Sequence, residues 1–203
     1  MKYIDKQLIT GLLLAGGRGS RMGHVDKGLQ TFRDAPMALH AMLRLTAQTG
    51  QILVNANQNI AAYESFGAPV WPDHTGGFAG PLAGLQTGLI HCETPYLLSV
   101  PCDSPFLPAD LAEKLGAALL DADADIALAV TRESEHEKSY LQRHPVFALL
   151  RANVLPSLNV FLQNGGRKVD AWFEELRVAE VIFEDNMAFR NINTLQELRE
   201  LES

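Results

Sequence analysis

A glycine-rich segment at residues 14–27 carries the groups best suited to holding phosphate. It follows an apolar run and continues from Leu14 as Leu-Ala-Gly-Gly-Arg-Gly-Ser-Arg-Met-Gly, with Arg18, Arg21 and Lys27 as its cations. Glycines let backbone N–H groups approach phosphate oxygens, and the cations neutralise the phosphate charge. The P-loop pattern is absent, and the dinucleotide-binding glycine pattern does not follow the run in register. The segment therefore predicts a loop that binds phosphate, such as the triphosphate of a nucleotide. The alternative is a plain surface turn, which the cations Arg21 and Lys27 disfavour.

A single aspartate after another apolar run is the best candidate for a metal ligand. Asp103 lies between Pro101 and Pro105, which stiffen the turn. Carboxylate oxygen is the donor that Mg²⁺ prefers, and Mg²⁺ usually takes one or two protein carboxylates together with phosphate and water. The alternative role, capping the next helix, suits Asp110 better because Asp110 is closer to the expected helix start. We therefore expect Asp103 to bind Mg²⁺.

Polar residues also follow two other expected strands. Asn55 and Asn57 carry amides that donate and accept hydrogen bonds, as the reading of a base edge requires. Asparagine is also a common turn residue. Asp73 can accept from a base or a ribose, or it can cap a turn. Each of these residues keeps both a binding and a structural interpretation at this point.

Two further segments offer groups for a second substrate. The glycines from Gly76 to Gly84 surround an expected helix start, where free N–H groups favour anions, and they suit close helix-to-sheet packing equally well. Asn191 and Asn193 lie on one face of the chain if it is extended, although Asn193 or Thr194 is expected to cap the last helix. His144 precedes a strand, and we expect it to be structural.

Strand and helix patterns alternate from end to end. Strands are expected at 9–14, 51–55, 69–71, 96–100, 126–130, 146–150 and 178–183. Helices are expected at 36–49, 60–66, 82–91, 108–120, 154–162, 169–176 and 194–201. This order predicts an α/β protein with an open, mostly parallel sheet and helices on both faces. Ligands bind beyond the carboxyl ends of such strands, so functional residues should follow Leu14, Val54, Trp71 and Val100.

Composition narrows the class of protein further. The chain has 203 residues, of which 47% are apolar, and no linker divides it, so we expect one domain over 1–203. A net charge of −7 gives no footprint for nucleic acid or for an anionic membrane. The apolar run 8–15 is too short to span a bilayer, and a cytoplasmic location is expected. The two cysteines and six scattered histidines predict neither a disulfide framework nor a zinc site.

Five motifs in order resemble the molybdenum cofactor guanylyltransferase family. They are Leu14-Ala15-Gly16-Gly17-x-x-x-Arg21-Met22-Gly23-x-x-Asp26-Lys27, Asn55-Ala56-Asn57, Gly80-Pro81-Leu82-Ala83-Gly84, Pro101-Cys102-Asp103-Ser104-Pro105 and Asn191-Ile192-Asn193. The match runs from about residue 9 to about 195. The first motif is shared by many nucleotidyltransferases, and its combination with the other four is specific. The resemblance implies a single-domain, three-layer α/β/α Rossmann-like nucleotidyltransferase fold, with a nucleotide-binding half at about 8–105 and a pterin-binding half at about 106–203.

The resemblance also implies a reaction and a role for each matching residue. GTP and Mo-molybdopterin would give the guanine dinucleotide form of the cofactor and pyrophosphate, with Mg²⁺ required. The residues that would bind GTP are Leu14, Ala15, Gly16, Gly17, Lys27, Asn55, Asp73 and Asp103. Those that would face the pterin are Arg21, Gly80, Gly84, Asn191 and Asn193. Lys27, Arg21 and Asp103 would act in catalysis, with Asp103 holding the metal.

Alternatives and departures remain at this level. A cytidylyltransferase making the cytosine form of the cofactor shares the fold, but its relatives tend to have alanine where Gly16 leaves room for a purine. A sugar-phosphate nucleotidyltransferase does not suit the later motifs, and a non-catalytic GTP-binding carrier is disfavoured by the intact Asp103 and Lys27. His24 stands where a well-known relative has glycine, and the charged segment 132–143 is expected to be an exposed loop. Further partners that the resemblance suggests are molybdoenzyme apoproteins, their chaperones and other proteins of cofactor biosynthesis.

Overall fold

The computed structural model describes residues 2–15, 26–74, 80–135, 138–192 and 197. Several expectations fall outside these residues and stay predictions. They concern Gly16, Gly17, Arg21, His24, Asn193 and nearly all of the helix expected at 194–201.

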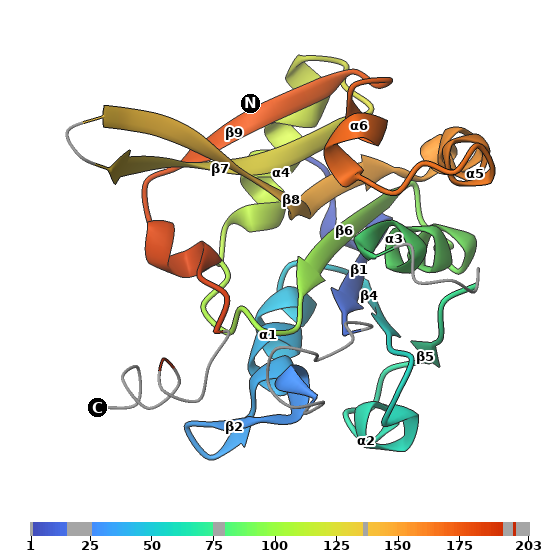
Figure 1. The fold of residues 1–203 in the computed structure, drawn as a ribbon, viewed down its shortest axis with the longest axis vertical. Coiled ribbons are helices and arrows are strands. Elements are labelled where there is room, and N and C mark those ends of the chain that lie inside the picture. Colours follow the sequence, from blue (N-terminus) through green and yellow to red (C-terminus); the bar gives the residue numbers. More distant parts are fainter. Residues whose placement is uncertain (1, 16–25, 75–79, 136–137, 193–196, 198–203) are drawn as a thin grey trace.

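Seven described strands form one sheet in the order β5-β4-β1-β6-β8-β7-β9 (Figure 1). They are β1 (Ile9–Leu14), β4 (Gln51–Asn55), β5 (Val70–Trp71), β6 (Tyr96–Pro101), β7 (Ile126–Glu135), β8 (Lys138–Arg151) and β9 (Val178–Phe183). The first four pair in parallel, and β9 is parallel to β7. Only β8 runs against its neighbours β6 and β7. The expected mostly parallel sheet is therefore confirmed.

Six α-helices connect these strands within the described residues. They are α1 (Met37–Thr46), α2 (Ile60–Glu64), α3 (Pro81–Ile90), α4 (Leu111–Asp121), α5 (Leu155–Gln163) and α6 (Val169–Phe173). Short 3-10 turns include η3 (Lys27–Leu29) and η5 (Asn186–Phe189). In the part of the chain that the structure describes, no helix is both long and apolar enough to cross a membrane.

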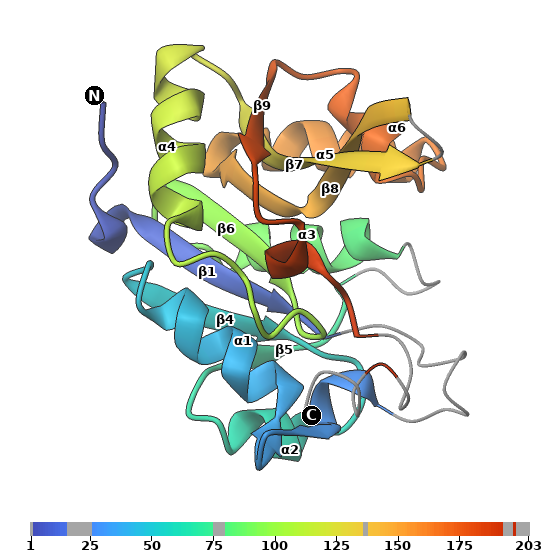
Figure 2. The same cartoon turned by 90° about the vertical axis from the view of Figure 1, so that its left-hand side faces the viewer.

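The core divides into two layers because neighbouring strand residues point to opposite faces of the sheet. Leu13 belongs to the cluster that contains residues of α1 and α4, and Leu12 belongs to the cluster with α3, α5 and α6. Figure 2 shows α1 and α4 together on one side of the sheet and α3 on the other. The three-layer α/β/α arrangement expected from the sequence is confirmed.

The charged segment 132–143 is not the exposed loop that the sequence suggested. It forms the outer part of a long hairpin, in which β7 and β8 stay paired from Val130 and Arg143 out to Glu135 and Lys138. The hairpin extends beyond the rest of the sheet (Figure 1). Backbone hydrogen bonds hold such a ribbon together, so its side chains need no apolar pattern where they face water. The exposed loop that was predicted from the charge content of this segment is therefore wrong.

A second hairpin, β2 (Thr31–Phe32) with β3 (Ala35–Pro36), was also missed from the sequence. Its two turn residues, Arg33 and Asp34, have φ values of 46° and 67°. Positive φ at both positions is the geometry of a tight hairpin turn, which usually takes asparagine and glycine. The Arg-Asp pair gave no signal of this turn.

Candidate functional site

The carboxyl ends of four parallel strands lie side by side at one edge of the sheet. Leu14 is in register with Asn55 and with Pro101, and Asn55 is in register with Trp71. The chain after each strand stays attached to its neighbour, because the Ala15 N–H donates to the Asn55 carbonyl at 2.8 Å and the Cys102 N–H donates to the Leu14 carbonyl at 3.0 Å. The residues predicted to be functional follow these strand ends. Because the strands pair in parallel, the segments that carry these residues start next to one another at one edge of the sheet.

Asp73 and two asparagines form a hydrogen-bonded group at this edge. The Asn55 amide donates to one carboxylate oxygen of Asp73 at 3.0 Å and the Asn57 amide to the other at 2.9 Å. The Asp73 N–H donates in return to the Asn57 side-chain oxygen at 2.8 Å. Asn57 thus holds both the backbone and the side chain of Asp73. Its part in this group was not assigned from the sequence, where only its position in Asn-Ala-Asn marked it.

Gly84 of α3 lets the helix approach this group closely. A Cβ at Gly84 would lie 2.5 Å from the Asn55 side-chain oxygen and 2.5 Å from Leu14 Cδ2. The packing interpretation of this glycine is therefore the one that the structure supports directly, and contact with a pterin stays a prediction. Gly80, which precedes α3, has φ +63°, and a Cβ placed there would meet no atom of the described residues within 4 Å. That conformation favours glycine.

Lys27 and Asp103 face each other from different elements. Lys27 begins η3, Asp103 follows β6, and their Nζ and Oδ2 atoms are 3.7 Å apart. Their side chains are 20% and 15% exposed, so the pair is partly removed from water. Burial raises the pKa of Asp103 above the ordinary aspartate value, while the Lys27 ammonium acts in the opposite direction. A cation and a carboxylate in this setting can neutralise phosphate and offer one hard oxygen to a metal.

The C-terminal motif reaches the same turn. The Ser104 hydroxyl donates to the Asn191 side-chain oxygen at 2.6 Å, and the Ile192 N–H donates to the Asp103 carbonyl at 2.9 Å. Ile192 is buried, and it packs in a small cluster with Phe32 and Met37. The structure therefore brings Asn191, predicted to face the second substrate, next to the predicted metal ligand.

Asp26 was part of a motif, but no role was assigned to it from the sequence. Its carboxylate accepts hydrogen bonds from the Gly28 N–H, from the Tyr63 hydroxyl and from the Asn59 amide. Two of these donors come from residues more than 30 positions away, so sequence spacing gave no sign of them. Asp26 directly precedes Lys27 and caps the turn that carries it.

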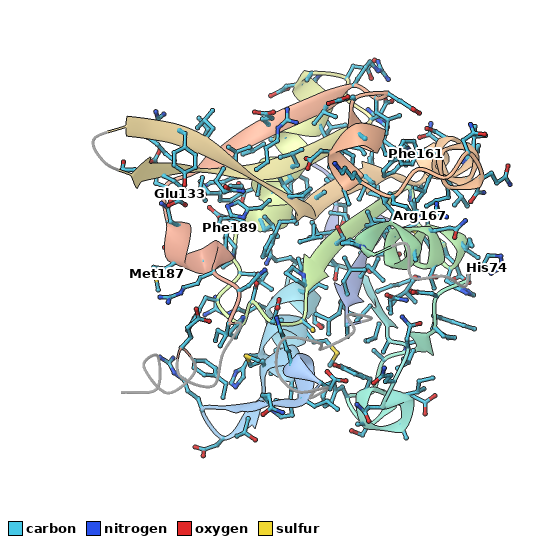
Figure 3. The ribbon with its side chains drawn as sticks, in the orientation of Figure 1. His74, Glu133, Phe161, Arg167, Met187 and Phe189 are labelled. Atoms are coloured by element: carbon cyan, nitrogen blue, oxygen red, sulfur yellow. The ribbon has the colours of Figure 1, made fainter. Side chains whose placement is uncertain are left out.

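His144 has the structural environment expected for it. His144 Nε2 lies 2.8 Å from the Thr131 hydroxyl, and its ring stacks on Phe189 with centroids 4.9 Å apart. Phe189 lies on the inner side of η5 and Met187 on its outer side (Figure 3). Burial lowers the pKa of His144 and raises the pKa of the Cys102 thiol. Within the described residues, no group of three or more His, Cys, Asp or Glu is placed to hold a metal.

A hollow of about 550 Å³ lies elsewhere, along the outer edge of β4. Trp71 and His91 line it and stack on each other, with centroids 3.7 Å apart. None of the residues predicted to bind nucleotide, metal or pterin lines this hollow. The geometry at the strand ends therefore defines the candidate site.

The family to which the fold belongs is a family of nucleotidyltransferases. Residues 11–179 match the family model of the MobA-like NTP transferase domain. A structure of molybdopterin-guanine dinucleotide biosynthesis protein A from Archaeoglobus fulgidus superposes with a TM-score of 0.75, covering 95% of this chain and 96% of that one. Because the two sequences are 20% identical, this superposition shows a shared fold and nothing beyond it.

Curated relatives narrow the class. A molybdenum cofactor guanylyltransferase from Bordetella petrii is 57% identical over 198 residues, covering 98% of this chain and 99% of the relative. One from Ralstonia nicotianae is 58% identical over 194 residues, covering 95% of each. The chain belongs to the molybdenum cofactor guanylyltransferase family, as its motifs predicted.

Proposed function

We propose that the protein transfers GMP from GTP to Mo-molybdopterin, forming Mo-molybdopterin guanine dinucleotide and releasing pyrophosphate. The family relationship supports the reaction, and the Lys27–Asp103 pair is the observation that supports catalysis by this chain. An oxygen of the pterin's terminal phosphate attacks the α-phosphorus of GTP. A new P–O bond forms, and the bond from the α-phosphorus to the oxygen of pyrophosphate breaks. This chemistry needs positioning and charge neutralisation rather than a protein nucleophile.

The Asn55–Asp73 group is suited to recognising the base. Guanine presents N–H donors that a carboxylate can accept, and Asp73 is fixed from both sides by amides. Leu14 and Ala15 leave β1 beside Asn55. In this proposal the base lies at that point, and the phosphates are bound by the glycine-rich segment that follows Ala15 in the sequence and by Lys27. The predicted GTP contacts of Leu14, Ala15, Gly16, Gly17, Lys27, Asn55, Asp73 and Asp103 form part of this proposal.

Asp103 is the residue that would hold Mg²⁺. One partly buried carboxylate fits this ion, because Mg²⁺ commonly takes a single protein carboxylate together with phosphate oxygens and water. When bound, Mg²⁺ would neutralise charge on the phosphates. Lys27 supplies the second positive charge, and its ammonium, already 3.7 Å from Asp103, donates to phosphate oxygen as negative charge develops. Arg21 is proposed to act on the same phosphates from the glycine-rich segment.

The pterin substrate is proposed to enter from the Asn191 side of the turn. Asn191 accepts a hydrogen bond from Ser104, one residue beyond Asp103, so an amide of the C-terminal half lies at the turn that carries Asp103. Gly80, Gly84, Arg21 and Asn193 complete the predicted pterin contacts.

The proposal further includes a cytoplasmic location and transfer of the product to molybdoenzyme apoproteins, their chaperones or other cofactor biosynthesis proteins.

A nucleotide panel tests the proposed reaction. The protein is incubated with Mo-molybdopterin and GTP, CTP, ATP or UTP, with Mg²⁺ or with excess chelator, and pyrophosphate release is followed. We expect release with GTP and Mg²⁺, dependent on the pterin. A preference for CTP would contradict the guanylyl assignment, and GTP binding without turnover would make the protein a carrier. Undiminished turnover in chelator would remove the metal from the proposal.

A further inference from the structure

The carboxylate of Asp26 accepts three hydrogen bonds from other parts of the chain. Oδ1 accepts from the Gly28 N–H at 3.1 Å and from the Tyr63 hydroxyl at 2.7 Å, and Oδ2 accepts from the Asn59 amide at 3.0 Å. Both oxygens of Asp26 therefore accept hydrogen bonds from the chain itself. These bonds connect the start of η3 to α2.

The α2 side of this connection is anchored in the core. Tyr63 is fully buried, and its ring meets Phe66 edge to face with centroids 5.7 Å apart. Burial raises the pKa of Tyr63, so its hydroxyl remains a donor. Asn59, at the start of α2, has φ +52°, a left-handed conformation that asparagine tolerates better than most residues. In this conformation the Asn59 amide donates to Asp26.

The η3 backbone is enclosed from two sides directly after Lys27. A Cβ at Gly28 would lie 2.5 Å from the Tyr63 hydroxyl and 3.0 Å from Cys102 Sγ. Cys102 immediately precedes Asp103, so the same close contact sets the distance between η3 and the turn of the proposed metal ligand. Lys27 therefore projects from a backbone that is fixed by Asp26 on one side and by Gly28 on the other.

We propose that Tyr63 and Asn59, acting through Asp26, are positioning residues that hold Lys27 against the reacting phosphates opposite Asp103. The inference rests on the proposed transfer reaction. A lysine side chain has many rotamers, and a fixed backbone reduces the number of arrangements in which its ammonium misses the phosphates. Because the developing charge belongs to the transition state, loss of the positioning residues should lower kcat more than it raises the KM for GTP.

Tyr63→Phe is the first test, because it removes only the hydroxyl and keeps the buried ring. We expect kcat for pyrophosphate release to fall about tenfold with the KM for GTP changed less than about twofold. Tyr140→Phe, on the exposed β7–β8 hairpin, is the matched control and should retain full activity. An unchanged kcat in Tyr63→Phe overturns the inference. A fall in kcat that is equally large in Tyr140→Phe overturns it too.

A double-mutant cycle separates positioning from general stabilisation. If Tyr63 acts through Lys27, then Tyr63→Phe has no further effect on kcat in a Lys27→Met background. Multiplicative losses in the double variant would contradict the inference.

A partner exchange between Asp26 and Asn59 gives a second test. Asn59→Asp places two carboxylates together and should lower kcat. The double variant Asp26→Asn/Asn59→Asp should restore most of the lost kcat. Failure of this rescue, with the single variant impaired and both variants folded, would also contradict it.

Hydrogen exchange at the Gly28 amide tests the connection without any turnover. We expect this N–H, which donates to Asp26, to exchange at least about fivefold faster in Tyr63→Phe than in the wild-type chain. Equal exchange rates would overturn the proposed connection. A wild-type protein that releases no pyrophosphate from GTP would instead contradict the proposed function, so the two failures are distinguishable.

Discussion

The two parts of the sheet use polar residues in different ways. At the carboxyl ends of β1, β4, β5 and β6, polar groups are partly buried and joined across elements, as in Asn57 with Asp73 and Lys27 with Asp103. Around β7, β8 and β9, several charged residues pair at the surface, as Arg143 does with Glu180. The partly buried His144 of this second region contacts the rings of Phe147 and Phe189.

The difference teaches where function and stability reside. A partly buried charge loses hydration, and that cost is offset only where partners or a ligand replace the water. An exposed ion pair contributes little to folding because water and salt screen it. We therefore expect substitutions at the strand ends to affect catalysis strongly, and substitutions around β7 to β9 to affect stability modestly and catalysis little.

Asp103→Ala should have the largest effect. Removal of the carboxylate takes away the proposed metal ligand, and we expect transfer to fall by at least about a thousandfold. Asp110→Ala is the matched control, because Asp110 pairs with Lys114 on the surface. Pyrophosphate release and thermal unfolding should be measured on both variants. Near-normal transfer by a folded Asp103→Ala protein would remove Asp103 from the mechanism.

Lys27→Met should follow, with kcat reduced about a hundredfold because one charge on the phosphates is lost. Methionine keeps most of the length and apolar character of the lysine side chain. Lys114→Met serves as the control, since Lys114 pairs with Asp110 away from the strand ends. If both variants lose the same small amount of activity in steady-state assays, Lys27 has no special part in catalysis.

Asn57→Ala should affect substrate binding more than chemistry. Asp73 would lose a donor to its carboxylate and an acceptor for its N–H, so we expect the KM for GTP to rise about tenfold with a smaller change in kcat. Asn186→Ala, which removes an exposed bond to the Arg132 carbonyl, is the control. A KM for GTP equal to that of the wild-type protein would show that Asn57 does not support the base site.

Because of His144, the free energy of unfolding should depend on pH. Burial holds its folded-state pKa below the ordinary value of 6.5, with Glu133 acting weakly in the opposite direction. As pH falls through 6.5, the unfolded chain takes up the proton more readily, so the free energy of unfolding should decrease. Denaturant titrations at pH 7.5 and pH 5.5 should show a smaller decrease in His144→Gln. The same decrease in both proteins would exclude His144 as its source.

Arg143→Gln should have the smallest effect. The guanidinium and the Glu180 carboxylate pair while their side chains are 46% and 34% exposed, so we expect a loss of at most about 0.5 kcal/mol in unfolding free energy. Activity should be unchanged. A loss of several kcal/mol, measured by denaturant unfolding, would show that the hairpin depends on this pair.

Local sequence patterns predicted much of the sheet. They did not predict contacts between residues that are far apart in the sequence. The apolar runs of β1, β4 and β6 predicted parallel strands, and parallel pairing then placed their following residues at one edge. Gly84 fits against Asn55 only after α3 packs on the sheet, so the sequence left its role open. Asp26 meets Tyr63 across 37 positions, and the backbone pairing of the charged hairpin leaves no apolar pattern to detect.

Direct detection of the product is the most decisive measurement. The protein, GTP, Mg²⁺ and Mo-molybdopterin are combined, and the pterin is analysed by mass spectrometry alongside a reaction with Asp103→Ala. The account predicts that the wild-type protein adds one GMP unit to the pterin with equimolar pyrophosphate, and that Asp103→Ala adds none. An unmodified pterin with the wild-type protein, or a CMP unit added from CTP in preference to GMP, would contradict it.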